Sequence, residues 1–366
     1  MPFVLFLLIV SVACAATYAA LMSYVKWYVA WENSQRHGMN YYGKTLAERR
    51  QIRRRMKLYS LLMPAAIGME QLFRATTKKV PGVPSVEFQG MTAPPYSCTR
   101  ESLEKAKAYQ PQKGDVFVTT QMKCGTTWMQ QIVYEILNHG KGDLTEKGAG
   151  HLCAVSPWLE SIDGIPVEKA PLVGEEKRRV IKTHLPISFC YHAAAKYIYV
   201  TRHPASCFAS ILDYFKLMSG RLAPPKERLL EWYCSERMWF SPWPDHAAGW
   251  WMKSREADNV LFLSFEEMKR DLPGAVRKAA QFLGVTLSGA EVDAVARKSG
   301  FDAMKTNEEY FEMSPPNFCA VRGSYFVDGS SSRHEAVSAA DRRKIRDFCI
   351  SRLDAKTMGL LDPYLL

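Results

Sequence analysis

Short runs of β-favouring residues alternate with helical segments between residues 115 and 283, and this alternation constrains the fold more than any other feature of the chain. The expected strands are residues 115–120 (DVFVTT), 179–182, 196–201 (KYIYVT) and 259–264 (NVLFLS). Helical patterns cover residues 128–139, 205–218 and 274–283. Strands that alternate with helices are typical of a parallel sheet. The sequence therefore predicts an α/β fold, a single three-layer domain with a central parallel sheet flanked by helices.

The N-terminus is apolar. Residues 1–25 contain no charged side chain and include the run FVLFLLIVSV. About 20 apolar residues cross a bilayer as a helix, so this segment predicts a transmembrane helix. A cleaved signal peptide is the alternative, because Ala13-Cys14-Ala15 has the small residues of a cleavage site, and a lipobox ending at Cys14 is a weaker one. We favour an uncleaved anchor because no charged n-region precedes the apolar run.

Positive charge lies only on the C-terminal side of this run. Between Lys26 and Lys79, twelve Lys and Arg stand against three Asp and Glu, and they account for most of the net charge of +11. The positive-inside rule places the flank that carries them in the cytoplasm. The nine cysteines show no metal-binding spacing and no N-glycosylation sequon occurs, which suits a reducing compartment. We expect a single-pass membrane protein whose folded domain faces the cytoplasm.

A basic helical pattern covers residues 44–57 and is followed by the apolar run LYSLLM. Such a segment suits anionic lipid headgroups better than nucleic acid, and it lies either in the membrane interface or on the folded domain through its apolar end. Prolines at 81–84 and 94–95 mark a linker. The expected organisation is an anchor over residues 1–25, a basic membrane-proximal helical segment and linker over 26–90, and the main domain over 91–366.

A turn joins the first strand to its helix through the sequence QMKCGTTW, residues 121–128. Backbone N–H groups at a helix N-terminus bind anions, Gly125 allows close approach, Thr126 and Thr127 add hydroxyl donors, and Lys123 adds charge. The turn predicts a phosphate-like ligand and makes the domain P-loop-like. It does not match a Walker A loop, in which Lys follows the second Gly, so a triphosphate with Mg²⁺ is not indicated.

Two further strand ends carry polar residues. One is Lys182-Thr183-His184-Leu185-Pro186 (KTHLP), and near neutrality a His is the side chain best suited to take a proton. The other places Arg202 at a strand end and Ser210 on the following helix, where an Arg fork suits a phosphate. The alternatives are a structural His, a surface ion pair and a helix hydroxyl.

Together these segments resemble the cytosolic-type sulfotransferases that use 3′-phosphoadenosine 5′-phosphosulfate (PAPS). The K-x-G-T-T-W run is similar to the family's 5′-phosphosulfate loop, although Met122 and Cys124 replace its usual Pro and Ser. KTHLP is identical to the stretch that carries the family's catalytic base. The resemblance implies His184 as the base, with Lys123 and Lys182 neutralising charge on the transferred group.

The resemblance also implies a donor site. Ser299 and Phe301 correspond to the adenine edge, Trp128 would stack on the base, and Arg322-Gly323 resembles a loop over the 3′-phosphate, with Val321 at a usual Arg position. The implied donor contacts are Lys123, Cys124, Gly125, Thr126, Thr127, Trp128, Arg202, Ser210, Ser299, Phe301, Arg322 and Gly323.

The resemblance implies an enzyme that transfers the sulfuryl group of PAPS to a hydroxyl acceptor by in-line displacement, without a metal. Two alternatives are a P-loop kinase or NTPase and a non-enzymatic membrane-anchored nucleotide-binding protein. The anchor and eight aromatic residues favour a lipophilic alcohol or phenol as acceptor, and the oligomeric state stays open. The alternative for most of these aromatic residues is a place in the hydrophobic core. They are Trp158, Phe189, Tyr191, Tyr214, Phe215, Trp239, Phe240 and Trp243.

Overall fold

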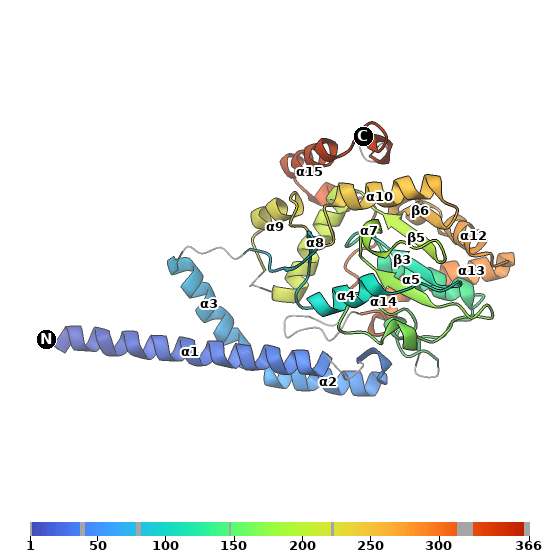
Figure 1. Cartoon of the computed structure of the whole chain (residues 1–366). Coiled ribbons are helices and arrows are strands. Elements are labelled where there is room, and N and C mark those ends of the chain that lie inside the picture. The colour runs from blue at the N-terminus through green and yellow to red at the C-terminus, as the bar shows by residue number, and fades with distance from the viewer. Residues whose placement is uncertain are drawn as a thin grey trace.

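The core of the protein is a four-stranded parallel sheet, seen at the centre of the computed structural model in Figure 1. The structure describes residues 2–36, 41–77, 82–145, 148–220, 223–312 and 325–361. The strand order is β4-β3-β5-β6. The strands are β3 (Val116–Thr119), β4 (Val180–Thr183), β5 (Lys196–Thr201) and β6 (Val260–Ser264). They lie within the four predicted runs or extend them by a single residue, and the predicted parallel sheet is confirmed.

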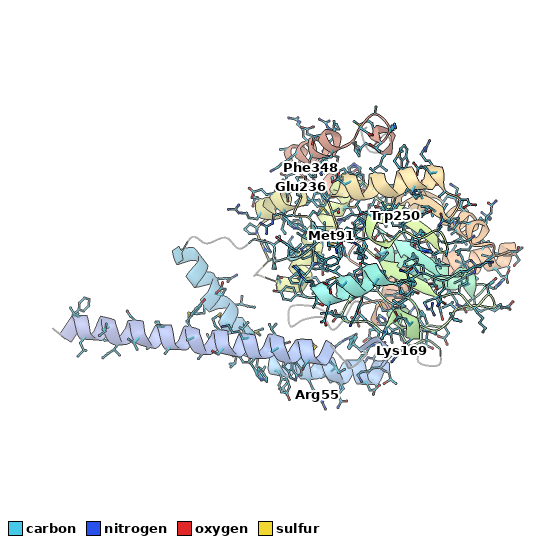
Figure 2. The ribbon with its side chains drawn as sticks, viewed as in Figure 1. Arg55, Met91, Lys169, Glu236, Trp250 and Phe348 are labelled. Atoms are coloured by element: carbon cyan, nitrogen blue, oxygen red, sulfur yellow. The ribbon has the colours of Figure 1, made fainter. Side chains whose placement is uncertain are left out.

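Two apolar cores lie on the two faces of the sheet because side chains alternate along each strand. Val116 and Val118 of β3 pack with α5 (Thr126–Leu137), α12 (Leu272–Leu283) and α13 (Gly289–Lys298). On the opposite face, Phe117 packs with helices that include α8 (Pro204–Ser219), α10 (Trp243–Glu256) and α15 (Ala339–Arg352). Figure 2 shows Trp250 of α10 within this second core. The three-layer arrangement is the one predicted.

The other elements are short or peripheral. The remaining helices of the main domain are α4 (Arg100–Ala108), α6 (Leu152–Val155), α7 (Ile187–Cys190), α9 (Lys226–Tyr233), α11 (Phe265–Arg270) and α14 (Phe301–Thr306). The 3₁₀ turns are η1 (Tyr41–Gly43), η2 (Val167–Lys169), η4 (Glu308–Tyr310), η5 (Arg333–Ala336) and η6 (Met358–Leu360). An antiparallel pair, β1 (Val86–Phe88) and β2 (Met91–Ala93), contributes Phe88, Met91 and Ala93 to the core that contains Phe117.

The chain begins with a long helix, α1 (Pro2–Arg36), whose N-terminal half projects away from the domain in Figure 1. Its segment Phe3–Trp31 has a mean hydropathy of 2.4 and is long and apolar enough to cross a membrane. The predicted anchor over residues 1–25 lies within this helix, which continues without a break to Arg36. The middle of α1 packs on α3 (Met63–Thr77), where the Tyr18 hydroxyl donates to Glu70, and its second half packs on α2 (Leu46–Tyr59).

The predicted basic helix is α2 (Leu46–Tyr59), which begins with a capping box between Thr45 and Glu48. Three of its arginines face the main domain: Arg49 is fully buried, and Arg50 and Arg53 pair with Glu309. Two apolar residues in the middle of the helix, Ile52 and Met56, form one cluster with Cys153 and Ala154 of the domain. Most of the apolar run after it remains exposed, with Leu61 at 71%, although Met63 at its end is buried. The predicted packing of this run on the domain is wrong for its exposed residues, and its place in a membrane interface stays a prediction. The contacts of the arginines were not predicted, because their partners lie more than a hundred residues away in the sequence.

Candidate active site

One cavity of about 350 Å³ lies at the carboxyl ends of β3, β4 and β5, where parallel strands place their outgoing turns along one edge. The loop at residues 120–125 follows β3, His184 follows β4, and Arg202 follows β5. The predicted site residues that line this cavity are Lys123, Gly125, Thr126, Thr127, Trp128, Lys182, His184, Arg202, Ser210, Ser299 and Phe301. Arg322 and Gly323 lie outside the described residues.

The loop after β3 forms a cradle that only glycine can complete. Gly125 caps α5 with a φ of +101°, a left-handed conformation that disfavours other residues. A Cβ at Gly125 would meet the Phe265 ring at 2.9 Å. The Thr126 hydroxyl is held 2.6 Å from that of Thr120, and the Thr127 hydroxyl lies 2.9 Å from that of Tyr325.

Cys124 does not present its side chain to the cavity. Its thiol is fully buried beneath the loop, with Sγ 3.3 Å from Sγ of Cys207. Only the backbone of Cys124 is therefore available to a ligand of the loop.

The tautomer of His184 is set by its surroundings. Its Nδ1 lies 2.9 Å from the carbonyl oxygen of Thr120, which only accepts hydrogen bonds, so Nδ1 carries the proton and Nε2 the lone pair. Burial, followed by the nearby Lys182 charge, holds the pKa of His184 well below its usual value. The ring is thus neutral near pH 7 and can accept a proton at Nε2.

Two lysines, Lys123 and Lys182, bring positive charge to the cavity that His184 lines. Burial, followed by the nearby charges of Arg202 and Lys182, lowers the pKa of Lys123 to about 8. Lys182 sits with its Nζ 4.1 Å from the centre of the Trp158 ring, and burial lowers its pKa as well. This concentration of cationic groups within a largely buried cavity favours an anionic ligand.

The sequence did not single out Glu160, which positions the end of β4. Its fully buried carboxylate accepts hydrogen bonds from the His184 N–H at 2.6 Å and from the Thr183 hydroxyl at 2.8 Å, and burial raises its pKa. His246 holds the other side of the same turn, with Nε2 3.0 Å from the carbonyl oxygen of His184. Neither Glu160 nor His246 belongs to a sequence motif, so only their contacts in the folded structure reveal their role.

Arg202 and Ser210 line the cavity together, as their spacing predicted. The Arg202 guanidinium donates to the carbonyl oxygens of Lys123 and Ser330, each at 3.2 Å, and lies 4.2 Å from the centre of the Phe265 ring. Its buried Nε has no hydrogen-bond partner among the residues that the structure describes. Because such a group is costly to leave unpaired, it is suited to bind an anion.

The predicted adenine edge also comes together. Trp128 donates its indole N–H to the carbonyl oxygen of Ser299 at 2.8 Å, and this bond fixes the ring plane at the cavity wall. Phe301 lines the wall beside Ser299, whose buried hydroxyl oxygen has no partner within the described part of the chain. The arrangement offers a flat aromatic face and a polar group to a planar base.

The remaining wall of the cavity is apolar. Of the eight aromatic residues expected there, Trp158, Tyr214 and Phe240 line it, together with Leu217 and Met218. The other five do not: Phe215, Trp239 and Trp243 are buried in the core, and Phe189 and Tyr191 pack against that core. For these five the alternative of a core position holds, because an apolar side chain in sequence does not distinguish a core from a pocket. In the described residues, no group of three or more His, Cys, Asp or Glu forms a metal site.

Comparisons with known proteins agree with this geometry. The profile of the sulfotransferase domain matches residues 113–331. Human sulfotransferase 2A1 is 32% identical over 257 residues, which cover 69% of this chain and 86% of that protein. The 3-alpha-hydroxysteroid sulfotransferase of Cavia porcellus is 32% identical over 251 residues, which cover 66% and 82%.

A solved structure shares the fold. Mouse sulfotransferase SULT7A1, complexed with PAP, superimposes with a TM-score of 0.59 at 21% identity and covers 76% of this chain and 98% of its own. The alternative of a P-loop kinase or NTPase is not favoured. The family profile spans the loop, the KTHLP segment and Arg202 in one match, and the chain therefore belongs to the sulfotransferase domain family and is a sulfotransferase.

Proposed function

We propose that this sulfotransferase transfers the sulfuryl group of PAPS to the hydroxyl of a lipophilic alcohol or phenol, with His184 as general base. One observation carries the proposal: the neutral His184 ring, the cationic loop and the apolar residues all line the same cavity. A donor bound at the loop and an acceptor bound at the wall would meet at Nε2 of this ring.

The residues present fit the donor. The Gly125 cradle and the start of α5 suit the 5′-phosphosulfate, and Lys123 adds charge there. The buried Nε of Arg202, with Ser210 nearby in the lining, suits the 3′-phosphate. Trp128, with the other adenine-edge residues, suits the base. Arg322 and Gly323 remain proposed contacts to the 3′-phosphate.

The chemistry assigned to these residues is an in-line displacement at sulfur. The donor supplies the sulfuryl group. His184 takes the acceptor proton at Nε2 as the acceptor oxygen forms its bond to sulfur, and the bond from sulfur to the phosphate oxygen breaks. Lys123 and Lys182 stabilise the negative charge that develops on the transferred group and on the departing phosphate oxygen. The cavity contributes by holding both reactants in position, which removes much of the entropic barrier.

The acceptor class is tested by sulfur transfer from ³⁵S-labelled PAPS. We expect kcat/KM to be higher for a sterol than for ethanol by about tenfold or more, because an apolar wall discriminates by roughly 1–3 kcal/mol even for small differences in apolar surface. The hydroxysteroid acceptor named for the Cavia porcellus relative supports this expectation. Equal kcat/KM values for the two alcohols would contradict a lipophilic acceptor, whereas labelled product with either would still support sulfotransfer.

We also propose that residues 1–25 anchor the enzyme in a membrane, that residues 26–90 form the membrane-proximal segment, and that residues 91–366 form a catalytic domain facing the cytoplasm. The exposed apolar segment Phe3–Trp31 and the positive charge behind it support this arrangement. The aromatic residues Tyr24 and Trp27 further along α1 suit a membrane–water interface.

Protease protection tests the topology. In sealed vesicles with the cytoplasmic face outward, a tag at the C-terminus should be cleaved without detergent, because the positive-inside rule leaves the domain on that face. Cleavage that requires detergent would overturn the cytoplasmic orientation. Recovery of the full-length enzyme in the soluble fraction after an alkaline carbonate wash would overturn the anchor.

A further inference from the structure

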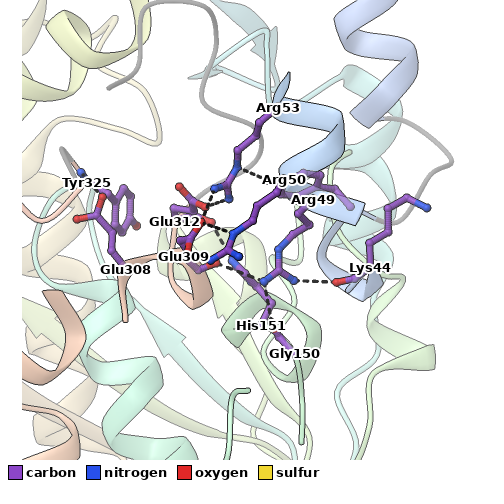
Figure 3. A network of polar contacts seen from close by, with 11 residues as sticks. Lys44, Arg49, Arg50, Arg53, Gly150, His151, Glu308, Glu309, Glu312 and Tyr325 are labelled. Carbon is purple, nitrogen blue, oxygen red and sulfur yellow. Dashed lines mark hydrogen bonds and ion pairs between the residues drawn. The ribbon is translucent and has the colours of Figure 1, made fainter. Parts of the chain in front are cut away.

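The buried Arg49 of α2 joins the N-terminal helices to the main domain (Figure 3). Its side chain is 0% exposed, and it donates to the carbonyl oxygens of Lys44 at 2.8 Å, Gly150 at 2.9 Å and Glu309 at 3.4 Å. A buried guanidinium is costly unless it is well paired, so these contacts fix where α2 lies on the domain. Two of the three acceptors belong to the main domain.

Two further arginines of α2 pair with carboxylates just after α14. Arg50 forms a bidentate ion pair with Glu309, with an Nε–Oε1 distance of 3.2 Å and an Nη2–Oε2 distance of 2.7 Å. Arg53 pairs with Glu309 at 3.3 Å and also with Glu312. A bidentate pair between an arginine and a carboxylate fixes the relative orientation of the two side chains in addition to pairing their charges. The segment 308–312 is therefore bound by α2 through both its backbone and its side chains.

A histidine of the main domain binds the same segment from another side. His151 accepts a hydrogen bond from the Cys153 N–H at Nδ1, so its Nε2 carries the proton and donates to the carbonyl oxygen of Glu312 at 2.9 Å. The centre of its ring lies 4.7 Å from that of Tyr42, which precedes α2, with the two rings tilted by 32°. Burial holds the pKa of His151 well below its usual value, and the ring stays neutral beside the arginines.

The opposite side of segment 308–312 faces the donor loop. The Glu308 carboxylate accepts hydrogen bonds from the backbone N–H of Tyr325 at 3.0 Å and of Phe326 at 3.3 Å. The Tyr325 hydroxyl lies 2.9 Å from the Thr127 hydroxyl, at the start of α5. Glu308, Tyr325 and Thr127 all line the active-site cavity. One turn of chain thus contacts α2 on one side and supports the donor loop on the other.

We infer that α2 is a positioning element of the donor site: Arg49 and Arg53 hold segment 308–312 so that Glu308 keeps Tyr325 against Thr127. The helix lies outside the residues that the sulfotransferase profile matches, 113–331, so this support is an addition to the family's domain. The inference rests on the proposed binding of the donor at the loop. It assigns to the membrane-proximal helix a role in donor affinity, distinct from membrane attachment.

The same helix provides a matched control. Arg54 and Arg55 are exposed, and neither has a hydrogen bond or ion pair with any residue in the described ranges. Figure 2 shows Arg55 on the side of α2 away from the main domain. Substituting either residue removes the same charge from the same helix without touching segment 308–312. A loss caused only by net charge or helix propensity would therefore appear in the control as well.

The experiment compares Arg53→Met with Arg54→Met in the full-length enzyme. Calorimetric titration with adenosine 3′,5′-bisphosphate (PAP) should give a Kd raised about tenfold by Arg53→Met and changed less than about twofold by Arg54→Met, a size typical of coupling between linked sites. The KM for PAPS should rise with the Kd, and kcat at saturating PAPS should stay within about twofold, because the reacting groups are untouched. Arg53→Lys should recover part of the affinity.

Glu309→Gln gives a second measurement that preserves side-chain shape. Glu309 does not line the cavity. A raised Kd for PAP in this variant would therefore favour the inferred role of α2, even if Arg53→Met fails to fold. An unchanged Kd in a folded Arg53→Met variant, or in Glu309→Gln, would overturn the inference. Equal losses in Arg53→Met and Arg54→Met would also overturn it. Failure of the unsubstituted enzyme to bind PAP would instead contradict the proposed donor site.

Discussion

Replacing His184 with alanine is expected to lower kcat by about 10²–10⁴-fold, the usual loss when a general base is removed. The reason is geometric. His184 lines the cavity, and because its Nδ1 donates to the carbonyl oxygen of Thr120, its Nε2 is the nitrogen left with a lone pair to accept a proton. The Kd for PAP should stay within about twofold, since the base acts on the acceptor proton. Steady-state kinetics and calorimetry on the same preparation measure both quantities.

The pH dependence adds a second readout for His184. Because burial and Lys182 lower the pKa of the ring, the active neutral form should persist as the pH falls below about 6.5, the ordinary value for histidine. The acidic limb of the kcat profile should therefore lie below that pH and vanish in His184→Ala. His192→Ala, at an exposed histidine, is the matched control and should leave kcat unchanged. Retention of most of the kcat by His184→Ala would remove this residue from the mechanism.

Replacing Arg202 with alanine should weaken PAP binding far more than binding of the analogue that lacks the 3′-phosphate. A charge-assisted hydrogen bond is worth about 1.5–3 kcal/mol, or about 10- to 150-fold in Kd. The buried Nε of Arg202 is unpaired within the described residues and lies in the cavity lining beside Ser210, which motivates the assignment. Calorimetric titration of each nucleotide into the parent enzyme and into Arg202→Ala gives the four Kd values required.

Arg202 also stabilises the loop, and the experiment must separate this role from contact with the 3′-phosphate. Its bonds to the carbonyl oxygens of Lys123 and Ser330 support the loop, so some loss is expected for both nucleotides. Only the difference between the two losses reports contact with the 3′-phosphate. Arg202→Lys should retain charge but not the fork, and should fall between the parent and Arg202→Ala. Equal losses for the two nucleotides would exclude Arg202 from the 3′-phosphate site.

The sheet and the donor loop were predictable because their signals are local. Residues 115–120 and 196–201 are short β-rich runs bounded by polar residues, and a parallel sheet brings their carboxyl ends to one edge whatever the details of packing. Gly125 could be identified because a tight turn before a helix has few other solutions. The resemblance to a family then placed His184 and Arg202 at the same edge.

The supporting residues were not predictable, because their contacts join distant parts of the chain. Glu160 lies outside every regular element, and its role becomes visible only when its carboxylate meets the backbone of His184. From the sequence, the arginines of α2 were interpreted as suited to anionic lipid headgroups. Their carboxylate partners, Glu309 and Glu312, are about 260 residues away in the sequence. Burial of a charged residue is decided by such partners, and sequence periodicity does not contain them.

The central claim, transfer of a sulfuryl group from PAPS at this cavity, is tested most directly by following label in metal-free buffer. The full-length enzyme is incubated with a sterol and either ³⁵S-labelled PAPS or ATP labelled in its terminal phosphate. The predicted result is ³⁵S in the sterol product without added metal, no phosphate label in it, and loss of the ³⁵S product with His184→Ala. Phosphate transfer to the sterol on adding Mg²⁺, with no transfer of ³⁵S to any hydroxyl compound tried, would contradict the account.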